Sequence, residues 1–82
     1  MSPTAARQLQ ERLPEAVAWA CYEFIRGPLA EEPHRVGAPL PRPFVGHWRA
    51  RRGEYRVRYT IDDDTKQVHV LDIDHRRDAY RR

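Results

Sequence analysis

The chain has 82 residues, which is enough for one domain and leaves no room for a second hydrophobic core. Hydrophobic residues make up 40% and charged residues 33%, with a mean hydropathy of −0.87, a composition typical of a globular protein. No run approaches the roughly 20 apolar residues of a membrane-spanning helix, and no signal-peptide core follows Met1. The single cysteine, Cys21, excludes an internal disulfide framework and a cysteine zinc site. We therefore expect a cytoplasmic protein without a membrane partner.

The positive charge is concentrated in the second half of the chain. The formal net charge is +3, and residues 1–41 carry −1 whereas residues 42–82 carry +4. Fourteen of the fifteen basic side chains are arginine, whose guanidinium group forks onto phosphate. A genome rich in G and C would give the same ratio of arginine to lysine without any functional reason. Composition alone therefore does not decide between phosphate binding and genome composition as the cause of the arginine excess.

The N-terminal third predicts two helices joined by almost no linker. Ser2 followed by Pro3 is typical of a helix start, and apolar spacing extends that helix to about residue 12. Pro14 restarts a second helix, and Gly27-Pro28 predicts its end. We expect a helical hairpin over about 3–26.

The remainder of the chain predicts a connector followed by strands. Residues 27–45 contain seven prolines and glycines, which favours a connector. Alternating apolar and polar residues predict strands over 47–52, 55–61 and 67–73, and a basic tail covers 74–82. The expected fold class is α+β, a single domain over 1–82 in which the helical hairpin packs on a C-terminal antiparallel three-stranded meander.

The first strand pair predicts an unusual charged face. A two-residue turn at 52–53 would pair Arg49 with Arg56 and His47 with Arg58 on the same face. Like charges directly opposite one another destabilise a sheet by up to about 1 kcal/mol per pair. A sequence selected only for folding would avoid this arrangement, so the face is a candidate functional surface.

The other face of the same strands is apolar and must meet the helices. Its residues are Trp48, Ala50, Tyr55, Val57, Tyr59 and Ile61. On the charged face, Asp72 should offset one of the arginine charges. We interpret the charged face as an anion site for RNA or DNA phosphates, with a simple solvated outer face as the alternative.

The basic tail extends the same theme. It holds four arginines, one histidine and one tyrosine, and an aromatic group among arginines suits base stacking together with backbone neutralisation. We expect His75 and Arg76 to emerge near the end of the charged face. The alternative is a frayed, solubilising terminus.

The charged face could support metal-free RNA cleavage. That reaction needs a general base, a general acid and fixed cations for the developing phosphorane charge. His47, His75 and Tyr80 are the nearby groups able to move a proton. We expect no metal and no cofactor, because the acidic run at 62–64 lies in a turn remote from the arginines.

Three further reactive side chains are expected to be structural. The histidines His34 and His69 lack the spacing of metal ligands. Cys21 falls on the core stripe of the second helix and is expected to pack.

Several motifs in chain order resemble one protein family. They are the segments at 4–9 and 33–40, G-x-Y-R-x-x-Y at 53–59, and D-H-R-x-x-x-Y-R at 74–81. Together they resemble the RelE/ParE superfamily of type II toxin–antitoxin toxins, in particular RelE-type mRNA interferases of actinobacterial kind. The usual first strand of that family is not found before the helix at 3–12, so the resemblance predicts an exposed sheet edge.

The resemblance implies a ribosome-dependent endoribonuclease that cleaves mRNA in the ribosomal A site and inhibits translation. It implies partners as well, namely mRNA, ribosomal RNA and a cognate antitoxin encoded by an adjacent gene, which forms a hetero-oligomer with the toxin. Arg49 and Arg56 would hold the phosphate, Arg76 would act as an acid or charge stabiliser, and Tyr80 would act as the base or stack on RNA. Further RNA contacts are expected from His47, Arg51, Arg58, His75, Arg77 and Arg81.

Two alternatives remain open from the sequence. The chain could be a ParE-like toxin that inhibits gyrase, which needs no nuclease residues. It could also be a truncated nucleic-acid-binding module without cleavage activity.

Overall fold

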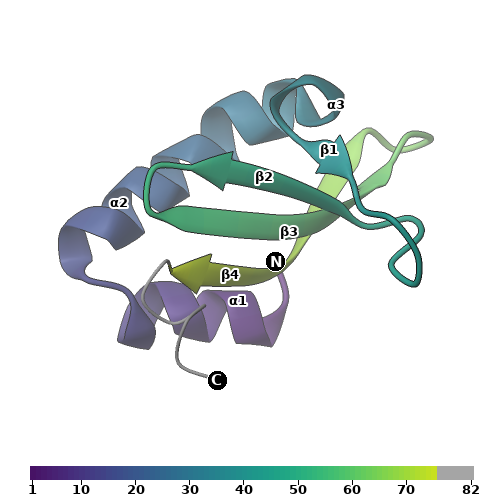
Figure 1. Cartoon of the computed structure of the whole chain (residues 1–82). Helices are drawn as coiled ribbons and strands as arrows, with labels where there is room; N and C mark the ends of the chain where they lie inside the picture. The colour runs from purple at the N-terminus through teal and green to yellow at the C-terminus, as the bar shows by residue number, and fades with distance from the viewer. Residues whose placement is uncertain (76–82) are drawn as a thin grey trace.

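The computed structural model describes residues 1–75, which form helices against a four-stranded antiparallel sheet of order β1-β2-β3-β4. In chain order the elements are α1 (Pro3–Arg7) with a π-helical continuation (Gln8–Arg12), α2 (Glu15–Phe24) with a π-helical continuation (Ile25–Leu29), α3 (Pro33–Val36), β1 (Ala38–Pro39), β2 (Trp48–Arg52), β3 (Tyr55–Asp62) and β4 (Gln67–His75). Figure 1 shows α2 crossing behind β2 and β3, with α1 alongside β4. No helix within residues 1–75 is long and apolar enough to cross a membrane.

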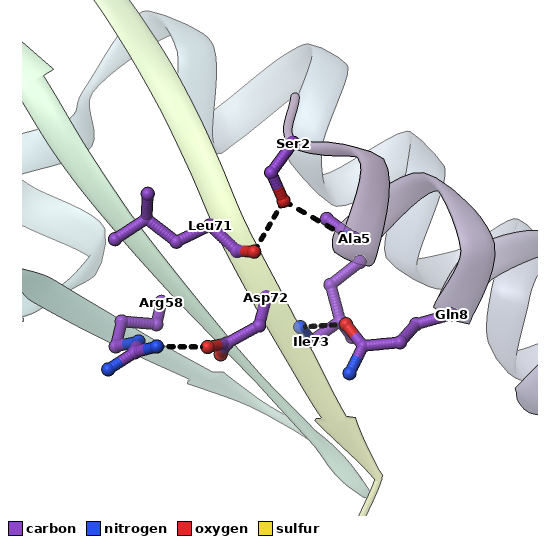
Figure 2. Close-up of polar contacts among 7 residues, drawn as sticks. All are labelled: Ser2, Ala5, Gln8, Arg58, Leu71, Asp72 and Ile73. Carbon is purple, nitrogen blue, oxygen red and sulfur yellow. Dashed lines mark hydrogen bonds and ion pairs between the residues drawn. The ribbon is translucent and has the colours of Figure 1, made fainter.

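The start of α1 is fixed to the outer edge of β4. The Ser2 hydroxyl caps α1 by accepting from the Ala5 N–H at 3.1 Å, while the Ser2 N–H donates to the Val70 carbonyl at 2.8 Å. The Ser2 hydroxyl also donates to the Leu71 carbonyl (Figure 2). Among residues 1–75 no strand precedes α1, as the sequence predicts. The middle of the β4 edge is nevertheless not bare, because α1 supplies hydrogen-bonding partners for it.

The second helix continues beyond its predicted end. The stop at Gly27-Pro28 is wrong, because helical turns run through Pro28 to residue 31 by way of the π-helical stretch. Proline removes a donor and crowds the preceding turn, and Pro28 lies within the π-helical stretch. The continuation brings Leu29 into the core, where it is fully buried. Burial of such a side chain contributes roughly 1.5–3 kcal/mol, comparable to the cost of a proline inside a helix.

The predicted connector contains regular structure. Helix α3 and the two-residue strand β1 lie within it, and β1 pairs with β2 through Ala38 opposite Arg49 and Pro39 opposite Trp48. The sheet therefore has four strands rather than the predicted three. Pro39 is tolerated because β1 is the edge strand of the sheet.

The register of the β2–β3 hairpin differs by two residues from the predicted one. Gly53, at φ +57°, is the first central residue of the turn, the position that a type II′ turn reserves for glycine. Arg49 therefore faces Arg58, and Arg51 faces Arg56; the predicted pairing of Arg49 with Arg56 is wrong. A shift of two residues keeps each side chain on its face, so the predicted division into an apolar and a charged face is confirmed.

The core lies between the helices and the apolar sheet face. Its buried members are Ala5, Cys21, Phe24, Leu29, Ala50, Tyr55, Val57, Tyr59, Val70 and Ile73. Both tyrosine hydroxyls are satisfied by helix backbone: Tyr59 donates to the Pro33 carbonyl at 2.6 Å and Tyr55 to the Ala20 carbonyl at 3.1 Å. Burial raises the pKa of each tyrosine to about 12, so both remain neutral donors.

Candidate nucleic-acid interface

A groove of about 650 Å³ lies over the charged face of the sheet. Its floor comes from β2, β3 and β4, one side from α1 and the first residue of its π-helical continuation, and the other side from the loop that joins β1 to β2. The lining residues are Thr4, Gln8, Leu40, Pro41, Arg42, Phe44, Arg49, Arg56, Arg58, Asp72 and Asp74. Four arginines against two aspartates give the groove an excess of positive charge, which is the electrostatic requirement for binding a polyanion.

Strand alternation places the arginines together. Arg49 and Arg51 on β2 lie opposite Arg58 and Arg56 on β3. The structure thus contains two directly opposed arginine pairs, each with an expected cost of up to about 1 kcal/mol. Arg56 and Arg58 are partly buried, whereas Arg49 and Arg51 are exposed. Arginines held against one another in this way are positioned for an anion placed between the strands.

A β-bulge in β4 adds two carboxylates to this face. Arg58 lies opposite Asp72 but Tyr59 lies opposite Val70, so Leu71 is an extra residue in the ladder. The extra residue reverses the alternation, so that Val70 and Ile73 are both buried while Asp72 faces the groove. Without the bulge, an aspartate two residues after a buried valine would point into the core.

Each of the two aspartates lies opposite an arginine of β3, and one of them pairs with it. Asp72 forms an ion pair with Arg58 (Figure 2), and their side chains are only 24% and 32% exposed. Asp74 lies opposite Arg56 in the strand ladder. The predicted role of Asp72 as a partial counter-charge is confirmed. The sequence analysis did not place Asp74 on this face. The signal was present, because the buried apolar residue changes from an even position at Val70 to an odd one at Ile73, which indicates an inserted residue.

Gln8 adds a polar contact at the same edge of the groove. Its side-chain oxygen accepts from the Ile73 N–H at 2.6 Å (Figure 2). Ile73 follows the bulge and lies between Asp72 and Asp74, so this bond fixes the outer edge of β4 where the strand carries the two aspartates. Sequence reasoning gave Gln8 no role, since a polar residue on a short amphipathic helix is ordinarily solvated.

The groove also contains an aromatic residue that the sequence analysis did not select. Phe44 is 45% exposed, and the Arg58 guanidinium lies 5.8 Å from its ring centroid. The Phe44 ring stacks on His47 with centroids 6.2 Å apart and an interplanar angle of 29°. The loop that carries Phe44 has no strand or helix period, so pattern reasoning had nothing to detect there. Phe44 lies close in sequence to the arginine-rich strand β2, and this was the signal that could have identified it.

The predicted site residues fall into three groups. Arg49, Arg56 and Arg58 come together in the groove, with His47 beside it and Arg51 on the same sheet face. The prediction that the histidine at the start of the tail emerges at this face is wrong. Four of the predicted residues lie outside the described part of the chain, namely Arg76, Arg77, Tyr80 and Arg81.

The misplaced histidine belongs to β4, not to the tail. His75 is 6% exposed and lies opposite the buried Tyr55. Its Nε2 is 3.6 Å from a Glu54 carboxylate oxygen. The strand continues two residues beyond its predicted end, and alternation after the bulge turns Asp74 to the groove and His75 to the core.

Cys21 and the first aspartate of the acidic run have structural roles in this fold. Burial raises the pKa of the Cys21 thiol to about 12, which keeps it protonated and unreactive. Asp62 accepts hydrogen bonds from the Asp64 and Thr65 N–H groups at 3.1 and 3.3 Å, confirming its predicted role in a turn. Within residues 1–75 no three His, Cys, Asp or Glu side chains are arranged to hold a metal ion.

Comparison with known proteins identifies the family. Residues 1–80 match the family model described as "ParE toxin of type II toxin-antitoxin system, parDE". Toxin RelE of Mycobacterium tuberculosis (strain ATCC 25618 / H37Rv) is 51% identical over 81 residues, covering 99% of this chain and 82% of the relative. Toxin RelG of the same organism is 48% identical over 79 residues, covering 96% and 91%.

A solved structure agrees with the sequence matches. The toxin–antitoxin complex RelBE2 from Mycobacterium tuberculosis contains a chain with a TM-score of 0.88 and 47% identity, covering 92% of this chain and 91% of that one. A helical layer on one face of an antiparallel sheet is thus a fold that this chain shares with a protein of a type II toxin–antitoxin complex. The chain belongs to the ParE toxin family of type II toxin–antitoxin systems, confirming the resemblance drawn from its motifs.

Proposed function

We propose that this toxin is an mRNA endoribonuclease that inhibits translation at the ribosome, with its groove arginines binding the scissile phosphate. The observation that carries the proposal is the convergence of Arg49, Arg56 and Arg58 in one groove over the sheet. The relatives named RelE and RelG support the nuclease over other toxin activities. Guanidinium groups on rigid strands are well suited to this task, because each can donate two parallel hydrogen bonds to phosphate.

The proposed chemistry is attack of a ribose 2′-oxygen on the adjacent phosphorus. The new P–O2′ bond forms as the P–O5′ bond breaks, leaving a 2′,3′-cyclic phosphate and a 5′-hydroxyl. Arg49 and Arg56 stabilise the negative charge that develops on the non-bridging oxygens. Removal of one such preorganised donor typically costs 10²–10³-fold in rate.

Proton transfer is assigned to the C-terminal segment. Tyr80 takes the proton from the 2′-hydroxyl and Arg76 stabilises or protonates the leaving oxygen. Both residues lie outside the described part of the chain, so these roles rest on the D-H-R-x-x-x-Y-R motif. His47, which stacks on Phe44 at the groove, is a described residue whose ring nitrogens can donate or accept a hydrogen bond.

Arg58 is assigned a positioning role. Its ion pair with Asp72 fixes the guanidinium group in the groove floor. Its Nε is buried and has no hydrogen-bond partner within residues 1–75. A buried donor without a partner costs about 1–3 kcal/mol, a local cost of the kind found where a side chain is held for function.

The proposed partner is a cognate antitoxin encoded by an adjacent gene. The similar chain of known structure comes from a toxin–antitoxin complex. The antitoxin would cover the groove or displace the segment after residue 75, and either action would block access of RNA. Translated mRNA, ribosomal RNA and the antitoxin are all found in the cytoplasm, which is the proposed location.

The test is to induce the chain in a bacterial host and map new mRNA 5′ ends. We expect cuts in phase with codons of translated mRNA, and their loss in Arg49→Ala, Arg56→Ala and Tyr80→Phe. Arg26→Ala is a matched control, because Arg26 is an exposed arginine of the helical layer. Intact mRNA in growth-arrested cells would overturn the nuclease proposal.

A second candidate is inhibition of gyrase, favoured by the family model that carries the ParE description. It predicts growth arrest with intact mRNA and gyrase trapped on DNA. Binding of RNA without any cleavage would instead indicate a nucleic-acid-binding module that has lost catalysis.

A further inference from the structure

The loop between β1 and β2 is built as a fixed support for Phe44. Its two ends are joined by the Leu40 N–H, which donates to the His47 carbonyl at 2.9 Å. The Phe44 N–H donates to the Pro41 carbonyl and the His47 N–H to the Phe44 carbonyl, each at 3.0 Å. Three internal hydrogen bonds in so short a loop hold the backbone of Phe44 in one conformation.

The Phe44 ring is held by contacts with other side chains, in addition to the hydrogen bonds that hold its backbone. The His47 ring stacks on the Phe44 ring, and the Arg58 guanidinium lies 5.8 Å from the Phe44 ring centroid, within cation–π range. Arg58 is in turn held by Asp72 through an ion pair. A chain of contacts therefore runs from the bulged strand β4 through Arg58 to Phe44, and it orients the ring relative to the arginines of the groove.

Phe44 does not contribute to the hydrophobic core. It is not part of the buried core, nor among the partly buried residues packed against that core, and 45% of its surface stays exposed. An aromatic ring held rigid, half exposed and beside a charged groove is placed for a ligand rather than for packing.

The charge beside the ring selects the kind of ligand. The groove has more arginines than aspartates, so it favours a polyanion, and the ring favours a flat apolar partner. Single-stranded nucleic acid carries both features in one repeating unit, a phosphate and a base. An acidic protein segment supplies the charge but has no such regular flat group.

We propose that Phe44, supported by His47, is a stacking platform for an unpaired base of the RNA whose phosphate the groove arginines bind. The proposal rests on the RNA-binding function proposed above and assigns it a base subsite. Because every base offers a π-face, the platform contributes affinity and orientation without strong preference for one base.

The test compares two single-stranded oligonucleotides of equal length and charge, an oligouridylate and the same ribose-phosphate backbone without bases. We expect the full chain to bind the oligouridylate about 5- to 150-fold more tightly, the ratio equivalent to about 1–3 kcal/mol for one stacked base. Phe44→Leu should bind both at the level of the abasic strand with an unchanged salt dependence. Phe44→Trp should retain the preference.

The control is Val45→Ala, which alters the neighbouring residue, 74% exposed and outside the groove lining; it should retain the full preference. Thermal melting of each variant checks that the fold is intact. If Phe44→Leu is folded and still prefers the oligouridylate, the platform is wrong. If the wild-type chain binds the two strands equally, the platform is wrong while phosphate binding stands. If it binds neither strand, the platform is wrong and so is the phosphate-binding role of the groove, while the nuclease proposal is decided by the mRNA cuts.

Discussion

The two faces of the sheet are made from alternate residues of the same strands, yet they serve opposite purposes. On one face, Val57 and Tyr59 are fully buried against the helices, and the tyrosine hydroxyl is satisfied. On the other face, Arg56 and Arg58 from the same strand each lie opposite another arginine. The apolar face supplies the stability that allows the charged face to keep unfavourable neighbours, which is why substitutions on the two faces should have separable effects.

The largest expected effect on stability belongs to the apolar side. Leu29→Ala removes a fully buried side chain from the core and should lower the free energy of unfolding by about 2–5 kcal/mol. Urea denaturation followed by circular dichroism measures this change. The molecules that remain folded should bind RNA as tightly as the wild type. A loss below 1 kcal/mol would show that the helical continuation past Pro28 contributes little.

The core tyrosines should make stability fall in alkaline solution. Burial raises the pKa of Tyr55 and of Tyr59 from 10 to about 12. Each therefore contributes stability that is complete below pH about 10 and is lost as pH rises towards 12, up to about 2–3 kcal/mol per tyrosine. The buried Cys21 thiol, whose pKa is also raised to about 12, adds to the loss from pH about 9 upwards.

The measurement is the melting temperature of wild type and Tyr59→Phe between pH 8 and about 11.5, a window set by these titrations. At pH 8 the variant should be less stable by about 1 kcal/mol, because it lacks the hydrogen bond to Pro33. The two melting temperatures should converge as pH rises. Parallel curves over the whole range would show that Tyr59 does not titrate with unfolding.

A smaller effect is expected where the sheet edge meets the core. A Cβ at Gly37 would lie 2.1 Å from the Tyr59 hydroxyl oxygen and 3.0 Å from the Arg49 carbonyl oxygen. Gly37→Ala should therefore destabilise the fold by about 1–3 kcal/mol. Gly27→Ala is the matched control, because no atom lies within 4 Å of its added Cβ, and it should be neutral or slightly stabilising. Equal melting temperatures for the two variants would contradict the close packing at Gly37.

Periodicity predicted the division of the sheet into two faces because that division depends only on alternation. The helix start at Ser2 and the arginine clustering also followed from local rules. The hairpin register could not be predicted in this way. A turn at residues 52–53 and a turn at residues 53–54 both keep the same alternation of faces, and the two differ in the backbone conformation that they require of Gly53.

The remaining differences come from tertiary context. The helix passes Pro28 because Leu29 reaches the core, a gain that local stop signals do not include. The bulge at Leu71 sends Asp74 to the groove and His75 to the core, and strict alternation cannot represent an inserted residue. Phe44 was missed because irregular loops have no period. In each case the error lies where a long-range contact overrides a local pattern.

The most direct test of the account is the salt dependence of binding to single-stranded RNA, measured beside the free energy of unfolding. The comparison is wild type against the double variant Arg49→Gln, Arg56→Gln, which removes one arginine from each opposed pair. We predict that the slope of log affinity against log salt falls by about 1.4 in magnitude, or about 0.7 per lost phosphate contact. The free energy of unfolding should stay the same or rise by up to about 1 kcal/mol per relieved pair. An unchanged slope together with reduced stability would contradict the account, because the arginines would then serve the fold and not the RNA.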